Sequence, residues 1–162
     1  MKIYKADLAD VERILAIQKI AYLSEAQRYN NYDIPPLRQT LAELQQEFAT
    51  HAILKATIDA DIVGSVRACE KNGSCYIGRL IVQPEFQGRG IGSALLKEIE
   101  KYFPNVSWFE LFTGQASNDN LRLYERHGYK AFKTEPLTET VSLLFMEKGV
   151  YRKGVYGKTH HP

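Results

Sequence analysis

The residues best suited to chemistry lie in a glycine-rich run, Gln87 to Ser93. The run follows an apolar strand-like segment, Ile77 to Val82, and leads into an amphipathic segment from Gly90 to Phe103. At the start of a helix the first backbone N–H groups lack partners, and the helix dipole adds about half a positive charge. Glycines leave these groups open to a ligand, and Arg89 can add a charge-assisted contact. The run therefore predicts a site for phosphate.

Two common phosphate loops do not fit this run. It has no Gly-Lys-Ser or Gly-Lys-Thr, so it is not a Walker loop. Gly88-x-Gly90 matches the start of a dinucleotide fingerprint, but Ser93 stands where the third glycine belongs, and a long helix-rich segment precedes the unit. A plain glycine-rich turn that only begins a helix is the remaining alternative.

The spacing Gln87-x-x-Gly90-x-Gly92 behind Leu80-Ile81-Val82-x-Pro84 resembles the acetyl-CoA loop of the GNAT superfamily of N-acetyltransferases. In that family the loop holds the pyrophosphate of coenzyme A. The resemblance implies a cofactor site made by Leu80, Ile81, Val82, Gln87, Gly88, Arg89, Gly90, Ile91, Gly92 and Ser93. The strand residues would act through their backbone, and the N–H of Leu80 or Ile81 would bond the thioester carbonyl. Their side chains are expected to pack in the core.

Tyr124 is the expected catalytic residue. The run from Asn120 to Tyr129 resembles the family's second signature, whose Tyr points at the coenzyme A sulfur and acts as general acid. A phenol with a pKa near 10 can protonate a departing thiolate. The alternative is that the Tyr124 ring only packs beneath its helix.

Asn120 lies one helical turn before Tyr124, so both face the same side. The resemblance implies that Asn120 contacts the cofactor. Many members carry this Asn seven residues before the Tyr, where this chain has Ser117, so the contacting amide is open between Asn118 and Asn120. We interpret Asn118 as an ordinary helix N-cap.

The general base is not identified. Some relatives place a Glu on the fourth strand, but Cys75 to Val82 contains no carboxylate. The carboxylates nearest to this strand by strand pairing are Glu70 and Glu110. Each is interpreted first as a solvated residue or a residue at the edge of the sheet. Ordered water is the alternative base.

The first two helices and their connection line the acceptor pocket in this fold. Here that segment supplies Tyr22, Glu25, Tyr29, Tyr32 and Asp33. Aromatic rings with carboxylates suit a cationic amine. The alternative is a helix end whose tyrosines pack on the sheet and whose acids are solvated.

Size and composition predict one domain, residues 1–150, followed by a polar tail, residues 151–162. The 162 residues are 44% hydrophobic and 25% charged, as in ordinary globular proteins. A net charge of +2 without a basic cluster argues against nucleic acid. We also expect no membrane contact, no metal site and a cytoplasmic location, because the chain shows no spanning run, signal peptide or zinc spacing.

Cys69 and Cys75 flank Asn72-Gly73, the strongest short hairpin signal. A two-residue turn pairs Glu70 with Cys75, which sends the two sulfurs to opposite faces of the sheet. A disulfide between them is therefore not expected.

The element order β-α-α-β-β-β-α-β-α-β-β resembles the GNAT fold from Lys2 to about Lys148. This α/β (α+β) fold has a mixed central sheet of about seven strands flanked by four helices. The expected strands are Lys2–Lys5, Ala52–Asp59, Ile62–Lys71, Ser74–Val82, Val106–Thr113, Tyr129–Thr134 and Val141–Glu147. The sheet is expected to splay between the fourth and fifth of them.

Together these residues predict an acetyl-CoA-dependent N-acetyltransferase that acts on a primary amine by direct transfer in a ternary complex. The acceptor is expected to be a small molecule or a peptide. Dimers are common in this fold, so a homodimer stays open. The alternative from another class is a non-catalytic sensor that binds acyl-CoA without turnover.

Overall fold

The structure is a computed structural model that describes residues 1–150, so the expected tail, residues 151–162, lies outside the described residues. The strands are β1 (Lys2–Lys5), β2 (Ala52–Ile58), β3 (Asp61–Lys71), β4 (Ser74–Val82), β5 (Trp108–Gly114), β6 (Lys130–Pro136) and β7 (Ser142–Gly149). The helices are α1 (Val11–Tyr29), α2 (Pro35–Arg38), α3 (Leu41–Glu47), α4 (Ile91–Lys101) and α5 (Asn118–Arg126), with short 3-10 turns η1 (Leu8–Asp10) and η2 (Pro84–Phe86).

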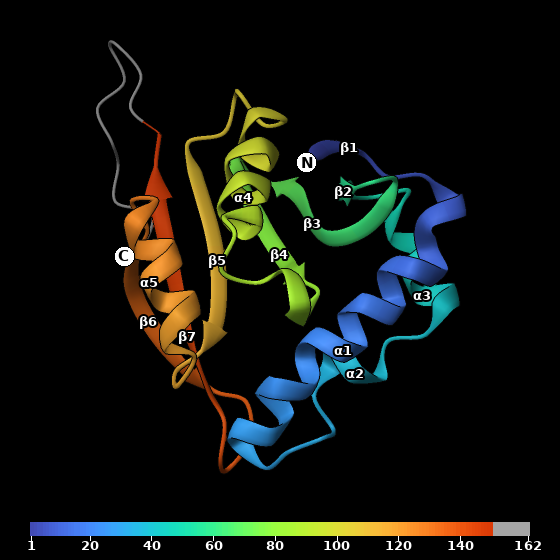
Figure 1. The fold of residues 1–162 in the computed structure, drawn as a ribbon. Helices are drawn as coiled ribbons and strands as arrows, with labels where there is room; N and C mark the ends of the chain where they lie inside the picture. The colour runs from blue at the N-terminus through green and yellow to red at the C-terminus, as the bar shows by residue number, and fades with distance from the viewer. Residues whose placement is uncertain (151–162) are drawn as a thin grey trace.

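The seven strands form one mixed sheet in the order β1-β2-β3-β4-β5-β7-β6. Neighbours are antiparallel except for β4 and β5, which pair in parallel only through Ser74–Tyr76 and Trp108–Glu110 within residues 1–150. Beyond these pairs the two strands diverge (Figure 1). The expected splay between the fourth and fifth strands is confirmed.

Two apolar clusters cover the two faces of the sheet. Because side chains alternate along a strand, Leu54 packs with α4 and α5 residues such as Leu95 and Tyr124, whereas Ile53 packs with α1 and α3 residues such as Ile14. Figure 1 shows α1 crossing the end of the sheet where β4 and β5 separate. Helices from both faces therefore border the splay.

A bulge interrupts β4 beside the splay. The register between β3 and β4 shifts between Ser65 and Arg67, and Arg79 adopts a left-handed backbone with φ of 50°. A bulge leaves a residue out of the ladder and re-aims its neighbours. Arg79 and Leu80 thus lie outside the regular register, whereas Ile81 and Val82 pair with Ser65 and Gly64 on β3.

The N-terminal half departs from expectation in three ways. Leu8 has the spacing of the apolar stripe of α1 but is 63% exposed, because Asp7 caps the 3-10 turn η1 and α1 begins only at Val11. The aromatic stretch after Ala21 is not a connection: α1 continues to Tyr29 and ends where Asn30 turns left-handed, with φ of 48°. Residues 1–150 contain five helices rather than the expected four, because Pro35 begins the single turn α2.

The hairpin between β3 and β4 has the expected register. Glu70 pairs with Cys75 and Cys69 with Tyr76, while Gly73 takes a positive φ of 81°. Both cysteines are free thiols. The hairpin expectation is confirmed.

Candidate active site

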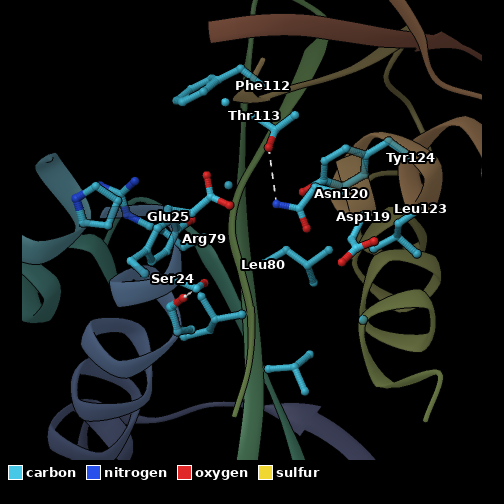
Figure 2. A pocket seen from close by; sticks show the side chains of 18 of the residues that line it. Ser24, Glu25, Arg79, Leu80, Phe112, Thr113, Asp119, Asn120, Leu123 and Tyr124 are labelled. Carbon is cyan, nitrogen blue, oxygen red and sulfur yellow. Dashed lines mark hydrogen bonds between the residues drawn. The ribbon is translucent and has the colours of Figure 1, made fainter. Parts of the chain in front are cut away.

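A cavity of about 830 Å³ opens where β4 and β5 separate. Its walls come from α1, α4, α5 and the diverging strands (Figure 2). Fourteen of the residues predicted for the site line it: Tyr22, Glu25, Tyr29, Leu80, Ile81, Val82, Gln87, Gly88, Gly90, Ile91, Gly92, Ser93, Asn120 and Tyr124. Volumes of this size are typical of small-molecule sites.

The glycine-rich run forms one end of the cavity. Gly88 and Gly90 have φ of 78° and 80°, and a Cβ at either position would meet nothing within 4 Å. Gly90 is the N-cap of α4 and supplies no side-chain cap, so the first N–H groups of the helix depend on a partner from outside it. Ser93 joins this end to the last turn of α5, with its Oγ 2.5 Å from His127 Nε2. Burial lowers the pKa of His127, which favours the neutral ring.

Tyr124 lies on α5 with its ring pointing into the cleft (Figure 2). It is 6% exposed, and its ring meets Tyr129 edge-on at 6.1 Å between centroids. Burial raises the pKa of Tyr124, and the nearby Tyr22 and Glu25 raise it further. The phenol therefore stays protonated at neutral pH.

Asn120 lies beside Tyr124, and its Nδ2 donates to Thr113 Oγ1 on β5 at 3.3 Å. Ser117, not Asn118, is the N-cap of α5, so the interpretation of Asn118 as an N-cap is wrong. The chain turns at Ser117, whose amide bonds the Gly114 carbonyl at 3.0 Å, and Asn118 becomes the first helical residue.

The end of α1 is fastened to the loop between β5 and α5. Ser117 Oγ donates to Glu25 Oε2 at 2.5 Å, and Arg28 pairs with Glu25 Oε1 at 2.7 Å. Nearby, the Ala116 amide donates to the Tyr29 hydroxyl at 2.6 Å, and Tyr29 covers Gly114 so closely that a Cβ there would collide with its ring. These contacts connect α1 to the loop after β5 at the edge of the cavity.

Tyr22 and Arg79 form the wall beside Glu25. The Arg79 guanidinium lies 6.0 Å from the centre of the Tyr22 ring. Burial raises the pKa of Tyr22, although Arg79 opposes the shift by its charge and a hydrogen bond. Figure 2 shows Glu25 and Arg79 on one side of the cleft and Asn120 and Tyr124 on the other.

Several candidate residues lie elsewhere. Arg89 is not among the cavity residues, and its guanidinium stacks over Phe86 at 5.1 Å. Tyr32 is 57% exposed and also lies outside the lining. Asp33, 81% exposed at its side chain, pairs with Arg38 at 3.4 Å.

Neither base candidate borders the cavity. Glu70 is exposed, as expected. Glu110 is only 7% exposed and stands opposite Tyr76 where β4 and β5 still pair, so the solvated or edge interpretation is wrong for it. The reason is that β5 has neighbours on both sides and is an inner strand.

Arg28 and Arg79 line the cavity but were not predicted. A charge inside the otherwise apolar segment Ile77–Val82 was a usable signal for Arg79, since charged residues are rare in buried strands. Arg28 carried no such signal, because its role depends on the turn at Ser117.

The sequence matches the family model described as acetyltransferase (GNAT) domain over residues 27–150, more than half of its length. The chain belongs to the GNAT acetyltransferase family. An uncharacterized N-acetyltransferase of Methanocaldococcus jannaschii is 34% identical over 84 residues, which cover 50% of this GNAT chain and 54% of that protein. YqkA of Bacillus subtilis, a UPF0157 protein, is 25% identical over 140 residues, which cover 86% of this chain and 40% of YqkA. The chain thus spans about half or less of the curated relatives it matches.

Solved structures share the GNAT fold. A ribosomal-protein-alanine N-acetyltransferase of Brucella melitensis superposes with a TM-score of 0.75 at 20% identity, covering 93% of this chain and 100% of that one. The PaiA N-acetyltransferase of Thermoplasma acidophilum, in complex with coenzyme A, superposes with a TM-score of 0.71 at 19% identity. The match covers 92% of this chain and 98% of that one. A putative acetyltransferase of Salmonella typhimurium with its cofactor acetyl-CoA gives 0.75 at 17% identity and covers 98% of each chain.

None of the helices within residues 1–150 has the length and apolar composition that a membrane span requires. No group of three or more His, Cys, Asp or Glu side chains there is arranged to hold a metal ion.

Proposed function

We propose that this GNAT protein transfers an acetyl group from acetyl-CoA to an acceptor amine by direct attack in a ternary complex. One observation carries the proposal: the glycine-capped start of α4 and the buried phenol of Tyr124 line the same cavity. An anion site and a proton donor in one cleft are what a phosphate-bearing thioester substrate requires.

The residues present fit coenzyme A. At Gly88 and Gly90 the backbone is open where a Cβ would otherwise stand, so a pyrophosphate can reach the N–H groups of residues 91–93. Along the splay, the backbone of Ile81 and Val82 would hold the pantetheine amides, and the N–H of Leu80 or Ile81 would face the thioester carbonyl. Asn120 would bond the same arm from α5. When bound, the cofactor supplies an acetyl group activated as a thioester.

Tyr124 would supply the proton. Its raised pKa keeps the proton on Oη at neutral pH, so a protonated donor stands in the cleft when the thiolate leaves. Its 6% exposure limits competition from water for that proton. Tyr124 Oη would give this proton to the leaving sulfur, and solvent would restore the proton to the phenolate afterwards.

Glu25 would hold the acceptor. Its carboxylate reaches the cavity with a side chain 16% exposed, and its negative charge acts on Tyr124 from across the cleft. A carboxylate there attracts an ammonium group and positions it near the reacting centre. Tyr22 and Tyr29 would complete the pocket with their rings. Ordered water would take the proton that the amine must lose.

Release of free thiol from acetyl-CoA, measured against a panel of small-molecule and peptide amines, tests the proposal. We expect release that depends on the acceptor, with one N-acetylated product for each thiol. Tight binding of acetyl-CoA, measured by calorimetry, with no release for any amine would contradict it and support the sensor function instead.

A further inference from the structure

Arg79 is placed in the cavity wall without a carboxylate partner. It lines the cleft next to Leu80, and within residues 1–150 no carboxylate oxygen lies within 4.0 Å of its guanidinium. Its Nε is buried and has no hydrogen-bond partner. A buried donor of this kind is costly unless a ligand satisfies it.

Arg67 shows the contrast. This neighbouring arginine is 3% exposed, pairs with Glu47 at 3.0 Å and donates to Gln18 and Gln39 at 2.9 Å each. Its charge is compensated by the protein itself. The charge of Arg79 has no such compensation, and Arg67 adds to the positive potential around it.

The backbone at Arg79 also favours a role for the side chain. Its φ of 50° lies in the left-handed region, where glycine or asparagine is the ordinary choice. Arginine has no conformational preference for this region, so the bulge places the Arg79 side chain in the cavity wall at a cost in backbone conformational energy. Strained residues of this kind concentrate at ligand sites.

Glu25 and Arg79 present opposite charges on the same side of the cleft. Both act on the Tyr22 hydroxyl, Glu25 raising the pKa of Tyr22 and Arg79 lowering it, so Tyr22 is close to both groups. They do not form an ion pair with each other, because Glu25 is bonded to Arg28 and Ser117. The space beside Tyr22 is therefore bordered by the uncompensated guanidinium of Arg79, an anchor for an anion, and by the carboxylate of Glu25, which is already paired with Arg28.

We propose that the acceptor is a small amine that also carries a carboxylate, an amino acid being the simplest such molecule, with its carboxylate on Arg79 and its amine near Glu25. The inference rests on the proposed function and narrows its acceptor. An arginine matches a carboxylate with parallel N–H donors. Polyamines and aminoglycosides, which carry only positive charge, are disfavoured by the same guanidinium.

Matched acceptors test the inference. Thiol release from acetyl-CoA is measured with the twenty common L-amino acids, their α-amides and the corresponding amines that lack the carboxyl group. We expect the best acid to exceed its own amide by about 10- to 100-fold in kcat/KM, the range for one charge-assisted bond. Arg79→Gln should bring that ratio close to one, and Arg79→Lys should retain part of it.

Arg122→Gln is the control, because Arg122 lines the cavity from α5 and is exposed. It should leave the acid-to-amide ratio as in the wild type. An amide accepted as well as its acid by the wild-type enzyme would overturn the inference while leaving the proposed function intact.

If no acceptor releases thiol, the proposed function fails, and binding decides the inference alone. Calorimetry on the coenzyme A complex should then show an amino acid binding at least 10-fold more tightly than its amide, a difference lost in Arg79→Gln. Equal binding of acid and amide would overturn it. Thermal unfolding of each variant shows whether it is folded.

Discussion

Ser117 at the start of α5 donates a 2.5 Å hydrogen bond to Glu25 near the end of α1. The two residues are 92 positions apart in the sequence, yet their bond joins the two walls of the cavity. Because Ser117 is 1% exposed, water does not compete for the bond. The acceptor side of the cleft therefore keeps its shape through a contact between the first long helix and the last.

Removing this contact should weaken acceptor binding. Ser117→Ala leaves Glu25 with Arg28 as its remaining partner, so we expect the acceptor KM to rise about 3- to 10-fold. We expect the free energy of unfolding to fall by about 1.5–3 kcal/mol, the cost of one hydrogen bond to a charged group. Steady-state kinetics and urea unfolding measure the two effects. Ser24→Ala is the control, because Ser24 also lines the cavity but bonds only Ala21 on its own helix. An unchanged KM in Ser117→Ala would show that the contact does not shape the pocket.

Gly90→Glu should abolish coenzyme A binding. The substitution places a carboxylate where the pyrophosphate is proposed to lie, and a positive φ of 80° disfavours any side chain. Gly73→Glu is the matched control: its φ is 81°, a Cβ there meets nothing within 4 Å, and it lies outside the cavity lining. Both variants should lose similar stability, about 1–2 kcal/mol. Calorimetric binding of coenzyme A to Gly90→Glu at near-normal affinity would refute the placement of the loop.

We expect that ionisation of Tyr124 causes no decline of kcat/KM at alkaline pH. Burial raises the pKa of this phenol, so its proton-donating form persists above the ordinary tyrosine pKa of about 10. The rate should instead rise with pH as the acceptor amine loses its proton, and then level off. Measured from about pH 6.5 to 10, kcat/KM in Tyr124→Phe should be lower but have the same shape. A decline of kcat/KM below about pH 10 in the wild type, absent from Tyr124→Phe, would show that the pKa of Tyr124 is normal or lowered and would contradict this prediction.

The two cysteines should be unreactive toward oxidation. Burial raises the pKa of both Cys69 and Cys75, and the thiol rather than the thiolate form prevails. Thiol titration should find Cys75 accessible only after unfolding, since it is fully buried. Intact mass under non-reducing conditions should match two free thiols. A mass lower by two hydrogen atoms, mapped to a Cys69–Cys75 link, would contradict the hairpin register.

The local sequence was enough for the strands, the glycine run and the hairpin at Asn72-Gly73. These features depend on neighbours in the chain, which is why a sequence can predict them. The splay and the place of Tyr124 in the cavity were expected only from the resemblance to the GNAT family, because they depend on contacts between distant parts of the chain.

Long-range contacts account for what the sequence did not show. Leu8 has the right spacing for the helix stripe, but the cap at Asp7 starts a 3-10 turn that leaves it exposed. Arg79 became a candidate only once the bulge in β4 put it in the cavity wall. The partner of Glu25 could not be read from the sequence, because it lies on the last helix.

The most direct measurement compares Tyr124→Phe with the wild type in acetyl-CoA turnover and in acetyl-CoA binding. Loss of the phenol proton should lower kcat by about 100-fold or more, the lower end for general acid catalysis, while the Kd for coenzyme A changes less than about 3-fold. Tyr102→Phe, an exposed tyrosine outside the cavity, should behave as the wild type. Wild-type turnover in Tyr124→Phe, with a folded protein, would contradict the account that Tyr124 protonates the leaving thiolate.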